Sequence, residues 1–155
     1  MPRRLLEILF ILAMIATALL GYRYAPQLNR QGDISVQPDS ACDLLQGPCS
    51  ATLPGIGRVE LEISPRPIPL LKPLQIRARL PGDSSDAQLE IDFAGASMEM
   101  GLNRQPLLPA GGNAYQGQTS LPICITGGMD WLATLIVVRD GRRLTVAFPF
   151  HTGPH

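Results

Sequence analysis

This chain of 155 residues has few histidines and no excess of charge of either sign. Thirteen basic residues balance thirteen acidic ones, so the basic face typical of nucleic-acid binding is missing and no nucleic-acid partner is expected. The only histidines, His151 and His155, fall in a predicted C-terminal tail (151–155), a poor place for a Ser-His-Asp arrangement. The sequence also lacks a standard phosphate-binding glycine loop. We therefore expect no catalytic residues and no enzymatic activity.

A long apolar run near the N-terminus predicts one transmembrane helix at residues 5–25. A helix of this length spans roughly 31 Å, close to the thickness of the bilayer hydrocarbon. Arg3 and Arg4 precede the run, so the positive-inside rule puts residues 1–4 in the cytoplasm and the remainder of the chain in the periplasm. The predicted inner-membrane anchor includes Leu5, Phe10, Leu20 and Tyr22, with Tyr22 at the level of an aromatic belt.

A cleaved signal peptide is the alternative interpretation of this run, because it also combines a basic start with an apolar core. The small residues Ala16 and Ala18 lie inside the apolar run, and the stretch 22–25 is bulky for a cleavage site. These features favour a retained anchor. Both interpretations place residues 26–155 outside the cytoplasm.

The rest of the chain is predicted to be a linker (26–41), an all-β domain (42–150) and the tail. Apolar and polar residues alternate with period two over 58–63, 74–80, 88–93, 98–103, 131–137 and 144–150, as in half-buried strands. Weaker strands are predicted at 114–119 and 121–126, and Asp140-Gly141 is a hairpin signal. The proline-rich stretch 64–73 is expected to be an edge or crossing segment. Seven or eight short strands predict an immunoglobulin-like β-sandwich.

Three cysteines leave one thiol unpaired or shared with a partner in an oxidising compartment. Cys42 and Cys49 enclose a Gly-Pro turn, so a local disulfide between them is expected. Cys124 is then a buried thiol. Alternatively, Cys124 pairs with one of the other two. Six residues separate the first pair, which does not match the two-residue spacing of redox or zinc motifs.

A Met-x-Met pair gives the most specific hint of site chemistry. On a strand, Met98 and Met100 share one face about 6.8 Å apart, and thioethers suit Cu(I). Met129 and His151 are the further candidate ligands. The alternative is that Met98 and Met100 fill the core, since methionine is a common gap-filler.

Several short motifs resemble the FixH and YtkA-like group of membrane-anchored periplasmic domains. They are Asp-Phe-Ala-Gly-Ala-Ser-Met-Glu-Met-Gly at 92–101, together with 115–117, 121–125, 129–131 and 144–150, so the resemblance covers roughly residues 55–150. It implies copper handling and the assembly of respiratory oxidases, without catalysis by the chain itself. The group carries a histidine beside its methionines where this chain has none, and the Cys42 and Cys49 pair has no counterpart there.

Three functional hypotheses follow from the sequence. The first is a membrane-anchored periplasmic accessory protein that helps to assemble or metallate a membrane complex, with a respiratory oxidase as the candidate partner. The second is a periplasmic Cu(I)-binding protein that uses the Met-x-Met strand. The third is a metal-free interaction domain of the cell envelope.

Overall fold

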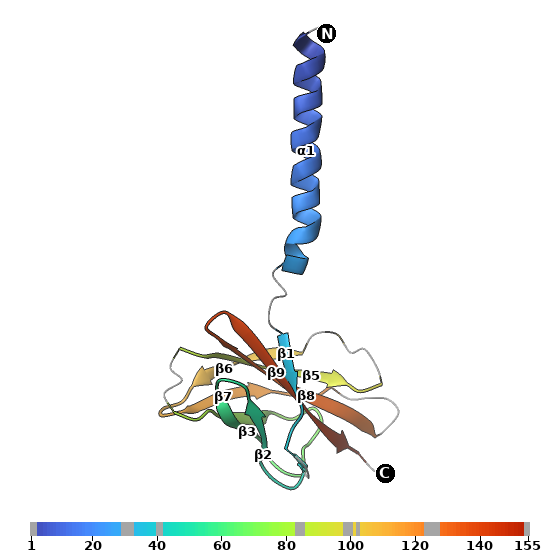
Figure 1. The fold of residues 1–155 in the computed structure, drawn as a ribbon. Helices are drawn as coiled ribbons and strands as arrows, with labels where there is room; N and C mark the ends of the chain where they lie inside the picture. Colours follow the sequence, from blue (N-terminus) through green and yellow to red (C-terminus); the bar gives the residue numbers. More distant parts are fainter. Residues whose placement is uncertain are drawn as a thin grey trace. The chain divides into compact units, whose positions relative to one another are not determined.

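The computed structural model describes residues 3–28, 33–39, 42–82, 86–97, 101, 103–122 and 128–153. The chain divides into two compact units, Met1–Gly32 and Asp33–His155. In the described residues, the first unit contains one helix, α1, and the second, called the β domain below, contains nine strands (Figure 1). The protein is therefore mostly β, as the sequence predicts.

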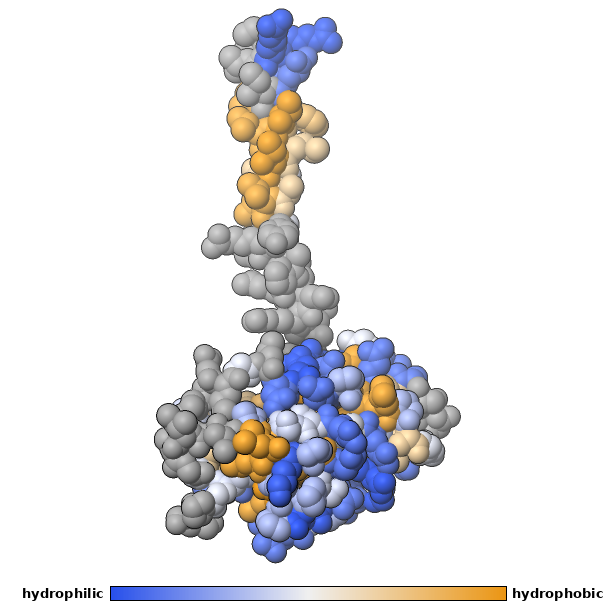
Figure 2. Space-filling view, turned by 180° about the vertical axis from the view of Figure 1, so that it is seen from behind, coloured by the Kyte–Doolittle hydropathy of each residue, from blue (hydrophilic) through white to orange (hydrophobic). Residues whose placement is uncertain are grey.

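Helix α1 (Arg3–Leu28) exposes apolar side chains on all of its described faces. Its only described hydroxyl, that of Thr17, donates to the backbone oxygens of Ala13 and Met14 within the helix, so this polar group does not need water. The large apolar side chains are each at least 50% exposed, and they form the hydrophobic band in Figure 2: Leu9, Phe10, Ile11, Leu12, Met14, Ile15, Leu19 and Leu20.

The described residues contain no helix with both the length and the apolarity of a membrane span. The anchor at 5–25 therefore stays a prediction. Phe10 and Leu20 lie on the exposed helix surface, whereas the side chains of Leu5 and Tyr22 lie outside the described part. The helix runs to Leu28, so the predicted start of the linker at residue 26 is wrong.

The nine strands form one sheet in the order β1-β9-β8-β5-β6-β7-β4-β3-β2. All neighbouring strands are antiparallel except β1 and β9, which are parallel. The strands are β1 (Asp33–Val36), β2 (Cys49–Leu53), β3 (Gly57–Ser64), β4 (Leu74–Arg79), β5 (Gln88–Gly95), β6 (Arg104–Pro109), β7 (Ala114–Thr119), β8 (Met129–Arg139) and β9 (Arg142–Thr152).

Strand β6 passes from one half of this sheet to the other. Its first residues, Arg104 to Leu107, pair with β5, and its last two, Leu108 and Pro109, pair with β7. The crossing brings β6 so close to β7 that a Cβ on Gly117 would lie 2.6 Å from Leu107 Cδ2 and 3.1 Å from the backbone oxygen of Pro106. A larger residue there would displace the end of the Leu107 side chain and push the Pro106 carbonyl away by a few tenths of an ångström. Because β6 pairs with β5 along its first part and with β7 at its end, it connects the two layers of the folded-over sheet.

One hydrophobic core fills the space between the layers. Alternate residues of each strand are buried, as in the pattern of buried and exposed residues along β4, because successive side chains point to opposite faces. Both halves of the sheet contribute completely buried side chains, such as Ile63 and Ile76 from one half and Ile91, Leu135 and Phe148 from the other. Sharing one core makes the nine strands a single folding unit.

The strongest alternations in the sequence predict their strands correctly: β3, β4, β5, β8 and β9 all contain the expected buried residues, and β7 matches the weaker prediction at 114–119. The hairpin prediction is also confirmed, since Asp140 (φ 51°) and Gly141 (φ 71°) connect β8 and β9 with the positive φ angles of a type I′ turn. The predicted crossing segment 64–73 joins β3 to β4.

Other sequence predictions need correction or are not covered. Residues 33–36 of the predicted linker form β1, which pairs with β9. The predicted tail begins too early, because His151 and Thr152 are the last residues of β9. Strands β2 and β6 were not predicted. Met98, Met100 and Leu102, which define the strand predicted at 98–103, lie outside the described residues, as does most of 121–126.

Candidate functional site

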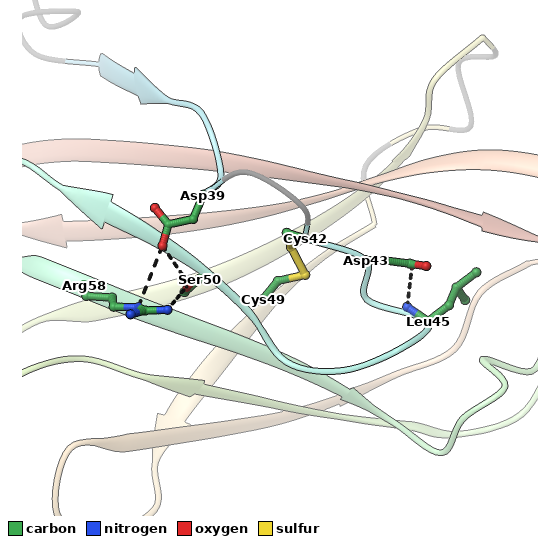
Figure 3. Close-up of a disulfide and its surroundings, with 7 residues drawn as sticks. All are labelled: Asp39, Cys42, Asp43, Leu45, Cys49, Ser50 and Arg58. Carbon is green, nitrogen blue, oxygen red and sulfur yellow. Dashed lines mark hydrogen bonds and ion pairs between the residues drawn. A yellow bond between two sulfur atoms is a disulfide. The ribbon is translucent and has the colours of Figure 1, made fainter.

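A disulfide-closed loop leads into β2. The predicted bond between Cys42 and Cys49 is confirmed, with the two Cα atoms 5.3 Å apart (Figure 3), within the usual range for a disulfide. Inside the loop, Asp43 accepts hydrogen bonds from the backbone N–H groups of the next turn, including Leu45 N to Oδ1 at 2.9 Å. Leu44 is completely buried in the core. The loop is thus fixed covalently, by hydrogen bonds and by packing. Cys124, the third cysteine, lies outside the described residues.

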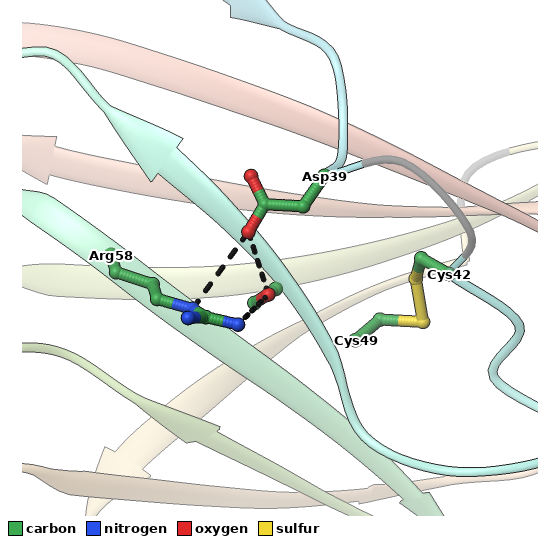
Figure 4. Close-up of polar contacts among 5 residues, drawn as sticks. Asp39, Cys42, Cys49 and Arg58 are labelled. Carbon is green, nitrogen blue, oxygen red and sulfur yellow. Dashed lines mark hydrogen bonds and ion pairs between the residues drawn. A yellow bond between two sulfur atoms is a disulfide. The ribbon is translucent and has the colours of Figure 1, made fainter.

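A small polar cluster beside this loop connects the N-terminal segment to β2. Asp39 Oδ2 accepts from the Ser50 hydroxyl at 2.7 Å, and the Asp39 N–H donates to the Ser50 carbonyl at 2.8 Å. Arg58 donates from Nη2 to Ser50 Oγ at 2.9 Å and lies 3.8 Å from Asp39 Oδ2 (Figure 4). The charged side chains are 74% and 42% exposed, so water weakens their attraction. The cluster contributes mainly by holding segment 33–39 in position, because this segment pairs with β9 at one end and with β2 at the other.

The structure does not bring Met129 and His151 together. Met129 is opposite Thr152 and is buried on the core side, whereas His151 is opposite Asp130 on the outer side of the same ladder. Directly opposed residues share a face and adjacent residues do not. The two side chains therefore point to opposite sides of the sheet. His151 Nδ1 instead lies 2.8 Å from Asp130 Oδ1.

No described part of the chain gathers three histidine, cysteine or acidic side chains in a metal-binding arrangement. The two remaining predicted ligands, Met98 and Met100, lie outside the described residues. Met129 and His151 therefore do not form one Cu(I) site together. The part of the predicted site made by Met98 and Met100 stays a prediction.

Met129 belongs to an aromatic end of the core. Trp131 donates from Nε1 to the buried hydroxyl of Thr152 at 2.9 Å, so the polar end of the indole is satisfied. Its ring stacks on Phe150 at 6.4 Å between centroids, and Phe93 meets Phe150 edge-on at 6.3 Å. Met129 is itself a buried member of this hydrophobic core, which is consistent with a packing role.

Two polar hollows are a different kind of feature, one on the outer face of β3, β4 and β7 and one where β4 begins, β7 ends and β6 begins. The first, of about 250 Å³, is lined by Glu62, Ser64, Gln75, Ile76, Arg77 and Gln116. The second, of about 370 Å³, is lined by Pro73, Asn103, Gln105, Gln118, Thr119 and Ser120. The alternation in the sequence identifies most of these side chains as outward-facing, but it does not reveal which strands are neighbours. Sequence reasoning therefore missed both hollows.

The first hollow forms where two oppositely charged residues on neighbouring strands do not pair with each other. Glu60 and Arg79 are opposite each other and close to 2.8 Å. Glu62 and Arg77 are opposite each other in the same ladder, but Glu62 binds Arg66 at 3.3 Å instead. With its amide oxygen turned towards β4, Gln116 accepts from Arg77 Nη2 at 2.8 Å and Nε at 3.2 Å. The charges are thus engaged at the walls, and the space between them stays open.

Comparison of the chain with protein-family models, curated proteins and solved structures gives no match.

Proposed function

We propose that this chain is an inner-membrane protein with a cytoplasmic N-terminus and a periplasmic β domain. In this proposal, it helps to assemble or metallate a membrane complex, with a respiratory oxidase as the candidate, and catalyses no reaction itself. The proposal combines the anchor predicted from the sequence, the short motifs that resemble the FixH and YtkA-like group, and the surface chemistry of the two units.

The observation that carries the membrane part is the surface of α1. From Leu9 to Leu20 every side chain is exposed, and the only polar one is Thr17, whose hydroxyl bonds within the helix. A helix that is apolar all round has no favourable contact with water and is typical of a buried or lipid-embedded segment. Arg3 at its start pairs with Glu7 at 3.7 Å, which suits the interfacial end of such a helix.

The β domain supports the periplasmic part. The Cys42–Cys49 bond is of the kind that persists in oxidising compartments. Two layers of mostly antiparallel strands around one core support an immunoglobulin-like sandwich, a common architecture for binding modules.

Metal delivery within this proposal depends on Met98 and Met100. An anaerobic Cu(I) titration of the full chain tests it, with Met98→Leu combined with Met100→Leu as the variant. Loss of binding in the variant supports metallation. Unchanged Cu(I) affinity contradicts the site and leaves assembly as the role.

The assembly role is tested by affinity purification of the tagged full chain after cross-linking in membranes. We expect an integral membrane protein to co-purify, and the abundance of its complex to fall when the chain is deleted from the cell. As a matched control, Leu12→Asp with Ile15→Asp places two charges on the apolar band and should abolish co-purification. Recovery of no membrane partner, together with an unchanged complement of membrane complexes on deletion, would contradict the proposal.

A further inference from the structure

The two polar hollows lie next to each other, the first on the outer face of β3, β4 and β7 and the second at the adjoining end of β4 and β7. Gln75, from the first hollow, is directly opposite Gln118, from the second, in the ladder between β4 and β7. Opposed residues have Cβ atoms about 5 Å apart, so only this pair of side chains separates the hollows. An extended ligand can therefore occupy both by passing over the pair.

The lining of the hollows is dominated by side chains that both donate and accept hydrogen bonds. Five carboxamides and three hydroxyls line them: Asn103, Gln75, Gln105, Gln116, Gln118, Ser64, Thr119 and Ser120. Each carboxamide offers an acceptor oxygen and a donor NH₂ group, and each hydroxyl offers both functions. Among the described residues, the side chains of Gln75, Gln105 and Gln118 have no hydrogen-bond partner.

Charge does not favour an ionic ligand at this face. The charged residues that line the first hollow, Glu62 and Arg77, have opposite signs and are engaged with Arg66 and Gln116. The described lining of the second hollow contains no charged side chain. A strongly charged ligand would find no surplus charge to offset the loss of its hydration.

The lining also differs from the centre of a protein–protein interface, which is enriched in aromatic residues and methionine. The described lining of the two hollows includes neither. A neutral chain rich in hydroxyl groups fits better, because each sugar hydroxyl both donates and accepts. The ring of Pro73 and the exposed side chain of Leu108, which lies opposite Gln116 on the same face, supply apolar surface for the C–H side of a sugar ring.

From this arrangement we propose that the two hollows together bind a neutral oligosaccharide, with Gln75 and Gln118 making the central hydrogen bonds. The two hollows have volumes of about 250 and 370 Å³, near the lower end of the range for small-ligand sites. This assignment concerns the β domain alone and does not depend on the membrane anchor or on a partner complex.

The test is calorimetric titration of the full chain in lipid nanodiscs, which avoid sugar-based detergents, with chitotetraose, cellotetraose and maltotetraose. We expect at least one tetrasaccharide to bind with a dissociation constant on the order of 1 mM or below. Gln75→Ala with Gln118→Ala should weaken that binding at least about tenfold. Gln88→Ala on β5, which is also exposed but lies in the other half of the sheet, should leave the affinity unchanged.

Failure of all three sugars to bind at concentrations several times above this range would overturn the proposal. Wild-type affinity in the Gln75→Ala/Gln118→Ala variant would do the same, as would tetra-alanine binding as tightly as the best sugar. Fluorescence of Trp131 monitors whether each variant remains folded, because this buried residue is the only tryptophan in the chain.

Discussion

Replacement of Cys42 and Cys49 by serine tests how strongly the disulfide loop holds the edge of the sheet. The two residues are seven apart in sequence, so the bond closes a loop of eight residues. The loop-entropy relation gives an entropy of about 8 cal/mol/K for this length, or about 2.5 kcal/mol of unfolding free energy at 25 °C. Complete detachment of Leu44 from the core would add about 1.5–3 kcal/mol.

The assay is urea unfolding of the full chain followed by the fluorescence of Trp131. A loss of about 2.5 kcal/mol lowers the midpoint by about 1–2 M for a typical urea slope. Reductant should produce the same shift in the wild type and none in the double variant. A double variant within about 0.5 kcal/mol of the wild type would refute the reasoning, because packing and the Asp39 cluster would then suffice to hold the loop.

Three further outcomes are expected. Gly117→Ala should lower the free energy of unfolding by about 1–3 kcal/mol, because its Cβ overpacks the β6 crossing. The control Gly47→Ala, whose added Cβ meets nothing within 4 Å, should change it by no more than about 0.5 kcal/mol. Equal urea midpoints for the two variants would contradict the close approach of β6 to Gly117. Thr152→Val should cost about 1–3 kcal/mol by leaving the buried indole N–H without its acceptor, and a neutral result would show that this hydrogen bond is not needed. In a Cu(I) titration, Met129→Leu and His151→Ala should each leave the affinity unchanged, and a loss in both would contradict their placement on opposite faces.

The sequence predicts those strands in which apolar and polar residues alternate along the strand itself. β3, β4, β5, β8 and β9 have apolar residues at every second position because one face of each packs on the core. β1 has only four residues and depends on a parallel partner more than a hundred residues away in sequence. β6 contains two prolines, at 106 and 109, and divides its pairing between two neighbours. Neither β1 nor β6 therefore shows a regular alternation of apolar and polar residues that would identify it from the sequence.

The candidate metal ligands illustrate the same limit. The sequence predicts a tail from His151, although the alternation through Phe148 and Phe150, extended by one residue, places this residue on the outer face. The disulfide was predictable because seven residues and a turn determine it locally. The polar hollows were not, because they depend on the neighbours of β4 and β7 in the sheet and on the way in which Glu62 and Arg77 turn apart.

Lys72 offers the most direct test of the central claim that the β domain lies outside the cytoplasmic membrane. It is the only lysine in the sequence, and it is exposed in the loop before β4. A membrane-impermeant amine-reactive biotin reagent is added to spheroplasts, and the full chain is then recovered from alkaline-washed membranes. We predict strong labelling of the wild type and none of Lys72→Arg, because Lys72 carries the only side-chain amine in the sequence. A chain that resists labelling until the cells are lysed, or that is released by the alkaline wash, would contradict the account.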